Sequence, residues 1–152
     1  MTKVINLYAG PGAGKSTTAA GLFYKMKMDL MSVELVSEYA KQLTWDGRHS
    51  ILESDQLYVL AKQHRKMVIL KDKVDYIITD SPILFSLIYA SKEYPEEVFG
   101  DLVWHLYNQY ENINIFLPRT KPYVTVGRNQ TEEQAKEIDL RVYEKFDQIY
   151  IF

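Results

Sequence analysis

The chain has 152 residues, of which 47% are hydrophobic, so we expect it to bury one core and to form a single domain over residues 1–152. It contains no cysteine, which excludes disulfides, thiolate metal sites and cysteine nucleophiles. Its net charge of −2 argues against a nucleic-acid partner. Its apolar runs are too short to span a bilayer, so we expect a cytoplasmic protein without a membrane partner. A homodimer is one option for its assembly.

The predicted elements alternate between strands and helices. The apolar run Lys3 to Ala9 predicts a buried strand, and apolar residues at helical spacing after Lys15 predict an amphipathic helix of about four turns. Further strands are expected at residues 33–37, 74–79, 113–117 and 149–152. Further helices are expected at residues 38–43, about 50–67, 96–110 and 131–147. Such alternation implies parallel pairing through right-handed crossovers, with ligands bound at the carboxyl ends of the strands.

Two pairs of residues have the spacing of a capping box, in which a hydroxyl side chain and a Glu or Gln side chain satisfy each other's backbone amides. Ser50 and Glu53 would begin one helix, and Thr131 and Gln134 would begin the last one. The polar segment before the last helix, residues 118–131, has two prolines and a glycine and is expected to form a lid loop.

The segment AGPGAGKST, residues 9–17, follows the first predicted strand and leads into the first predicted helix. It fits the phosphate-loop pattern G-x-x-x-x-G-K-[ST] except that Ala9 replaces the first glycine. The loop amides and the positive end of the helix would bind phosphates, Lys15 would bridge them, and the Ser16 hydroxyl would bind Mg²⁺. The expected nucleotide-binding residues are Gly10, Pro11, Gly12, Ala13, Gly14, Lys15, Ser16 and Thr17. The alternative is an ordinary glycine turn before Lys-Ser, which the flanking strand and helix disfavour.

Two acidic residues stand at the carboxyl ends of predicted strands. Asp80 follows the third strand and would bind Mg²⁺ opposite Ser16, or it would close a turn with Ser81 and Pro82. Glu38 follows the second strand and would act as a general base toward an acceptor hydroxyl, or it would cap the helix that follows.

The five arginines are candidates for binding charged groups. Arg128 in the lid loop is the best candidate to stabilise a transferring phosphoryl group, with Arg141 as second choice, and Arg119 is a candidate nucleotide contact. Arg48 and Arg65 lie between the second and third strands, where an acceptor would bind, and each would either clamp an acceptor phosphate or face water.

These features resemble the P-loop kinase superfamily of nucleoside and nucleotide kinases, and more narrowly the small AAA-type kinase domains related to the bacterial nicotinamide riboside kinase domain. The residues that carry the resemblance are AGPGAGKST (9–17), SEYAK (37–41), Gln63, IITDSP (77–82), and Tyr123 through Gly127-Arg128 ahead of Thr131-Glu-Glu. Lys41 stands where the related domains often have arginine, which weakens the transfer of their substrate to this chain.

The resemblance implies an α/β three-layer sandwich with a five-stranded parallel sheet ordered 2-3-1-4-5 and helices on both faces. It also implies ATP at the phosphate loop, a lid over it, and an acceptor that meets Glu38 and Gln63. The leading hypothesis is an ATP- and Mg²⁺-dependent kinase of a nucleoside, nucleotide or related ribosyl compound, with Lys15, Glu38, Asp80 and Arg128 as its catalytic residues. The alternatives are a nucleotide-binding switch and a polynucleotide 5′-end kinase, of which the second is disfavoured by the acidic composition.

Overall fold

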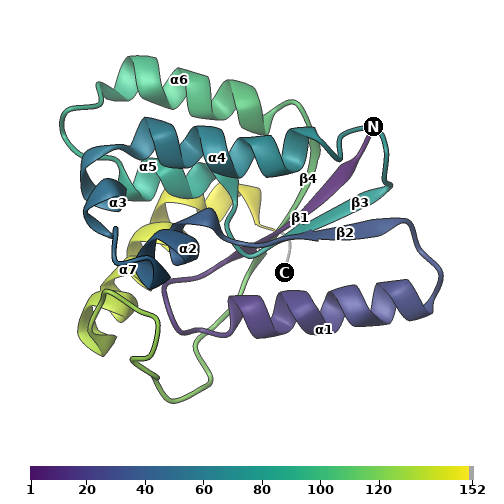
Figure 1. Cartoon of the computed structure of the whole chain (residues 1–152), viewed down its shortest axis with the longest axis horizontal. Helices are drawn as coiled ribbons and strands as arrows, with labels where there is room; N and C mark the ends of the chain where they lie inside the picture. The colour runs from purple at the N-terminus through teal and green to yellow at the C-terminus, as the bar shows by residue number, and fades with distance from the viewer. Residues whose placement is uncertain (151–152) are drawn as a thin grey trace.

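A computed structural model describes residues 1–150 and shows a parallel sheet between two layers of helices (Figure 1). The strands are β1 (Lys3–Tyr8), β2 (Val33–Val36), β3 (Tyr76–Thr79) and β4 (Glu111–Phe116). In space they follow the order β2-β3-β1-β4, and all three pairings are parallel. The α/β class, the parallel sheet and the order of its first four strands are therefore as predicted.

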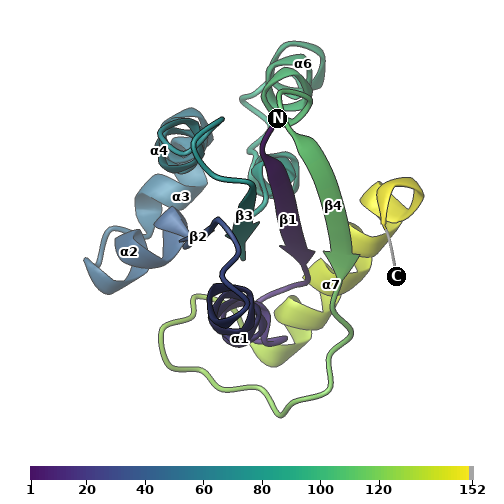
Figure 2. The same ribbon diagram turned by 90° about the vertical axis from the view of Figure 1, so that its right-hand side faces the viewer.

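Helices connect these strands and cover both faces of the sheet. The helices are α1 (Lys15–Met28), α2 (Tyr39–Trp45), α3 (Ser50–Ser54), α4 (Gln56–Val68), the 3₁₀ turn η1 (Ile83–Phe85), α5 (Ser86–Tyr89), α6 (Glu96–Tyr107), α7 (Glu132–Phe146) and the 3₁₀ turn η2 (Asp147–Ile149). Helix α1 lies on one face, and α4 and α6 lie on the other (Figures 1 and 2). None of the described helices has the length and apolarity needed to cross a bilayer.

Side chains of β1 alternate between the two faces of the sheet, as a strand with period two requires. Val4 and Tyr8 belong to the larger core cluster, which also contains residues of α4, α6 and α7. Ile5 and Leu7 belong to a smaller cluster with Ala19 of α1. Strand β1 is thus buried on both faces, which explains its almost uninterrupted apolar sequence.

The prediction of a fifth strand at residues 149–152 is wrong for the residues that the structure describes. Ile149 lies in the turn η2, while residues 151–152 are outside the described part of the chain. The aromatic side chain of Tyr150 packs instead against Tyr8 and Phe116, with ring centroids 5.3 and 5.6 Å apart. Ile149 and Tyr150 pack against the larger core cluster, so their apolar character reflects this packing and not a strand.

One of the two expected capping boxes forms. Thr131 Oγ1 accepts a hydrogen bond from the backbone N–H of Gln134 at 3.2 Å, and Gln134 Oε1 accepts one from Thr131 N–H at 2.9 Å. The prediction for Ser50 is wrong, because Ser50 lies inside the short helix α3. Asp55 caps α4 in its place and accepts a hydrogen bond from Tyr58 N–H at 3.0 Å. The expected single helix is therefore broken into α3 and α4 at Asp55.

Candidate functional site

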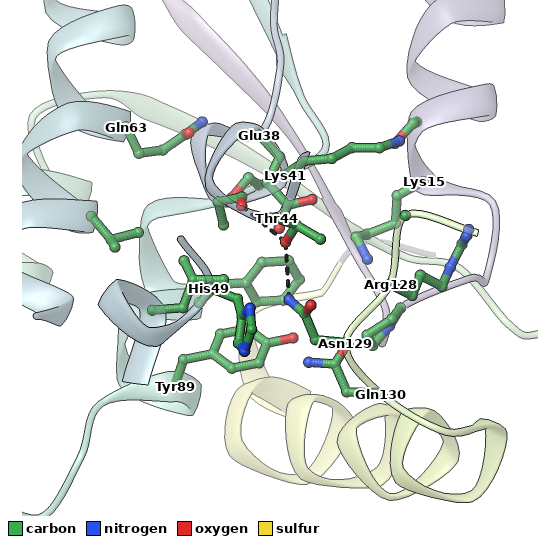
Figure 3. A pocket seen from close by; sticks show the side chains of 18 of the residues that line it. Lys15, Glu38, Lys41, Thr44, His49, Gln63, Tyr89, Arg128, Asn129 and Gln130 are labelled. Carbon is green, nitrogen blue, oxygen red and sulfur yellow. Dashed lines mark hydrogen bonds between the residues drawn. The ribbon is translucent and has the colours of Figure 1, made fainter. Parts of the chain in front are cut away.

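A pocket of about 350 Å³ lies beyond the carboxyl ends of β1, β2 and β3. Its walls come from the loop between β1 and α1, from α2, α3 and α4, from the segment after β3, and from the loop between β4 and α7 (Figure 3). We call the first of these the phosphate loop (residues 9–17) and the last the lid loop (residues 118–131). The pocket thus lies where parallel sheets bind ligands.

The phosphate loop has the backbone geometry of an anion site. Gly12 and Gly14 have φ of 75° and 103°, values that glycine adopts without strain, and α1 begins directly after them at Lys15. The start of α1, with the positive end of its dipole, therefore lies at the pocket lining. Ala9 is fully buried and its φ is not positive, so alanine is compatible with the position where the pattern has glycine.

Lys15 is held at the base of this loop and forms no ion pair with a described carboxylate. Its Nζ donates to the carbonyls of Ala9 and Gly10 at 2.8 and 3.0 Å. Burial lowers the pKa of the Lys15 ammonium, and the carboxylates of Glu38 and Asp80 oppose this shift. The ammonium is therefore positioned beside the loop and is not neutralised by direct pairing, which suits it to bind phosphate.

Asp80 connects the phosphate loop to the end of β2. The Ser16 hydroxyl donates to its Oδ2 at 2.5 Å, and Glu38 N–H donates to its Oδ1 at 3.0 Å. The alternative, that Asp80 closes a turn with Ser81 and Pro82, is not realised. The side chain that bonds to this turn is Thr79, whose hydroxyl accepts from Ser81 N–H at 3.1 Å. Two adjacent oxygen ligands fit Mg²⁺ chemically. The described residues contain no cluster of three acidic, His or Cys side chains, so phosphate oxygens and water would complete such a metal site.

Glu38 occupies the N-cap position of α2 but makes no capping hydrogen bond with its side chain. The capping alternative is therefore not realised, and the carboxylate lines the pocket. Burial raises the pKa of Glu38, while Lys15 lowers it. Lys41, one turn further along α2, also lines the pocket and also lowers the pKa of Glu38. A carboxylate with a raised pKa in a pocket has the properties of a general base.

The lid loop lies over the phosphate loop and reaches α2. A β-carbon built on Gly12 would lie 2.8 Å from the ring of Tyr123 and 3.1 Å from Arg128 Nε, which shows how closely the two loops approach. Arg128 also stacks on Tyr123, with 5.7 Å from its Cζ to the ring centroid. At the far end of the lid loop, Asn129 Nδ2 donates to Thr44 Oγ1 at 2.9 Å (Figure 3). Arg128 is thereby placed at the pocket.

Three of the remaining arginines are not brought to the pocket lining. Arg48 is exposed and forms an ion pair with Asp46 at 3.1 Å, and Arg65 is exposed on α4. Arg141 donates to the carbonyl of Ile88 at 2.7 Å. The structure thus offers no support for an arginine clamp on an acceptor phosphate.

Arg119 is also absent from the pocket lining, because it forms an ion pair with Asp139 of α7. One of its guanidinium nitrogens, Nη1, has no partner among the described residues. That Arg119 contacts the nucleotide stays a prediction. Of its guanidinium nitrogens, Nη1 is the one free to donate to a phosphate, since Nε and Nη2 already have partners.

Gln63 of α4 is buried and lines the part of the pocket beyond Glu38. Its Oε1 accepts from Tyr39 N–H at 2.9 Å, which fixes the orientation of the amide and leaves Nε2 without a partner in the described chain. An oriented buried donor of this kind is suited to a polar ligand atom. The structure therefore brings Gln63 and Glu38 to one pocket.

The whole-chain comparison identifies the family. The sequence matches the family described as AAA domain over residues 4–151. The chain belongs to this AAA domain family. A search of curated proteins found no significant match to this chain.

Two solved structures are similar to the chain, one of them closely enough to show its fold. Deoxyadenosine kinase from M. mycoides with bound dATP is similar with a TM-score of 0.52, at 21% identity over 95% of this chain and 84% of that one. APS kinase of Mycobacterium tuberculosis, a Cys556Ala mutant, is similar with a TM-score of 0.46, at 18% identity over 94% of this chain and 98% of that one. The similarity to the deoxyadenosine kinase structure shows that the chain has a P-loop kinase-like fold, as its sequence resemblance implied.

Several residues at or beside the site had no role in the sequence-based prediction. Asp139 was not a candidate, although it follows the buried Ile138 on a helix whose other buried positions are apolar or small. An acidic residue bordering a buried stripe is a usable signal. Tyr123 was noted only within the resemblance, and Asn129 had no signal because its partner is 85 residues away.

Proposed function

We propose that the chain is an ATP- and Mg²⁺-dependent phosphotransferase that moves the γ-phosphoryl group of ATP to a hydroxyl of a nucleoside or a related ribosyl compound. One observation carries this proposal. A single pocket is lined by the phosphate loop with Lys15 and Ser16 and by Glu38, and it extends beyond Glu38 into further space lined by α3, α4 and α5. Asp80 is buried just behind this lining and accepts the hydrogen bond of the Ser16 hydroxyl. A nucleotide switch needs no acceptor space and no base.

Each part of the pocket has a role in this reaction. The N–H groups of the phosphate loop bind the β- and γ-phosphates, and Lys15 neutralises charge on them. Ser16 and Asp80 would hold Mg²⁺, which supplies further charge neutralisation when bound. Glu38 accepts the proton of the attacking hydroxyl. Arg128 offsets the negative charge that spreads over the transferring group.

The charges around the acceptor space favour an uncharged acceptor over a monophosphate. The lining beyond Glu38 comprises His49, Leu52, Glu53, Gln56, Val59, Gln63 and Tyr89. Its acidic member is Glu53, a carboxylate that would repel a phosphate, while Lys41, which also lines the pocket, lies on α2 beside Glu38. Arg48 and Arg65 are not in this lining. A nucleoside, which offers hydroxyl and base edges to amides such as that of Gln63, fits this lining better.

The proposal is tested by incubation with γ-labelled ATP, Mg²⁺ and three sets of acceptors, which are nucleosides, nucleoside monophosphates and 5′-hydroxyl oligonucleotides. We expect label on a nucleoside and its loss in the Lys15→Ala variant. Lys25→Ala is the matched control, because Lys25 is an exposed lysine of the same helix. Tight ATP binding without transfer to any acceptor, together with ATP-dependent association on sizing, would instead support a switch.

A further inference from the structure

Asp139 of α7 contacts the phosphate loop and the lid loop at the same time. Its Oδ1 accepts a hydrogen bond from Gly10 N–H at 2.6 Å, and its Oδ2 accepts one from Arg119 Nε at 2.8 Å. Arg119 Nη2 then donates to the carbonyl of Pro11 at 2.7 Å, which closes a ring of contacts. The side chains of Arg119 and Asp139 are only 11% and 15% exposed, so water screens this pair weakly.

Helix α7 also packs directly on the phosphate loop at this point. A β-carbon built on Gly10 would lie 2.4 Å from the carbonyl oxygen of Ala135 and 2.8 Å from Asp139 Oδ1. Gly10 thus packs closely against α7, and its N–H is hydrogen-bonded to a side chain of the same helix. Residues 129 positions apart in the sequence are held in one geometry.

The same contacts continue into the lid loop through Tyr123. Its ring lies near two guanidinium groups, with 6.0 Å from its centroid to Arg119 Cζ and 5.7 Å to Arg128 Cζ. The Tyr123 hydroxyl donates to the carbonyl of Gln130 at 2.5 Å. Arg119 is thus fixed on one side to the phosphate loop and contacts on the other side the ring that supports Arg128.

We propose that Asp139 and Arg119 are positioning residues that couple the geometry of the phosphate loop to closure of the lid loop. A buried ion pair adds little net stability compared with apolar side chains, and its use lies in the geometry that it specifies. The pair is neutral as a whole, so it orders the loop without adding net charge beside the bound phosphates. This proposal rests on the proposed function only in that the ordered loop binds a triphosphate.

The first test measures hydrogen–deuterium exchange of the free chain in the double variant Arg119→Met/Asp139→Leu, which keeps the net charge of the wild type. We expect exchange to rise about tenfold in residues 9–14 and also in residues 118–131, because charge-assisted hydrogen bonds to both loops are lost. The control is Val142→Ala, which opens the core one turn further along α7 at a fully buried side chain. It should lower the melting temperature without raising exchange in either loop.

The second test measures the affinity for Mg²⁺-ATP by calorimetry. We expect binding to be about tenfold weaker in the double variant, a loss that corresponds to one charge-assisted hydrogen bond. Binding by Val142→Ala should be unchanged. The coupling would be overturned if either loop of the double variant exchanged at the wild-type rate. It would also be overturned if the exchange rate rose equally in Val142→Ala. If the wild type bound no triphosphate, the proposed function would fail, whereas the exchange result would still decide the coupling.

Discussion

The phosphate half and the acceptor half of the pocket are held by different kinds of contact. In the phosphate half, Lys15, Ser16 and Asp80 are fixed by partly buried hydrogen bonds to neighbouring loops. In the acceptor half, Gln63 is fixed by a buried hydrogen bond from Tyr39 N–H, but α3 contains no buried residue and the lid loop is joined to α2 by an exposed hydrogen bond from Asn129 to Thr44. We infer that the first half is preorganised for one chemical group, and that the second adjusts to the acceptor.

The Glu38→Gln variant should distinguish the two halves most clearly, because it should impair phosphoryl transfer and spare ATP binding. We expect kcat for phosphoryl transfer to fall by about 10²–10⁴-fold, because an amide cannot accept the hydroxyl proton, while ATP affinity changes little. Glu53→Gln is the matched control, because it removes a carboxylate from α3 in the same pocket. It should change KM for the acceptor and leave kcat nearly constant. An equal loss of kcat in both variants would contradict the role of Glu38 as base.

We expect the pH profile of kcat/KM to have an acidic limb from Glu38 and an alkaline limb from Lys15. Glu38 must be ionised to act, and burial raises its pKa, so activity should fall about tenfold per pH unit below a pKa that is higher than the usual value for Glu. Lys15 must be protonated to bind phosphate, and burial lowers its pKa. Activity should therefore fall with rising pH, starting at a pH below the usual pKa of Lys. Glu38→Gln should remove the acidic limb alone. Persistence of that limb in the variant would assign it to another group.

Strand and helix types were predictable where a local pattern determined them. Strand β1 is buried on both faces, and Thr131 forms its capping box with Gln134 within four residues. The two failures have different causes. Asp55 caps α4 through a hydrogen bond from Tyr58 N–H only three residues away, so a second local signal competed with that of Ser50. Tyr150 packs on the distant rings of Tyr8 and Phe116, a tertiary contact that residue spacing does not report.

In the candidate site, too, residues that follow a strand directly were predictable, and residues placed by long-range contacts were not. The phosphate loop, Asp80 and Glu38 follow strands directly, so the parallel sheet brings them together at one edge. The arginines were ambiguous, because a charged residue in a loop or on a helix face gives no direction for its side chain. Asp139 was not predicted, because its contact with Gly10 spans 129 residues. Sequence thus located the chemistry better than it located the supporting contacts.

Gly10→Ala perturbs the phosphate half through packing alone. The added β-carbon would lie 2.4 Å from the backbone oxygen of Ala135, so α7 must shift, and we expect a loss of about 1–3 kcal/mol in the free energy of unfolding. Gly21→Ala on α1 is the control, because nothing lies within 4 Å of its β-carbon, and it should stabilise by about 0.5–1 kcal/mol. Thermal and denaturant unfolding measure both. A neutral Gly10→Ala would show that α7 yields freely at this contact.

The smallest expected effect concerns the exposed bond that joins the lid loop to α2. Asn129→Ala and Thr44→Val each remove one partner of the 2.9 Å hydrogen bond. A neutral exposed hydrogen bond contributes about 0.5–1.5 kcal/mol at most, so we expect KM for the acceptor to rise by only a few fold in each variant. Because the two residues act through one contact, the double variant should be no worse than either single one. Additive losses would show that the residues act separately, in which case the acceptor half would not depend on this bond for closure.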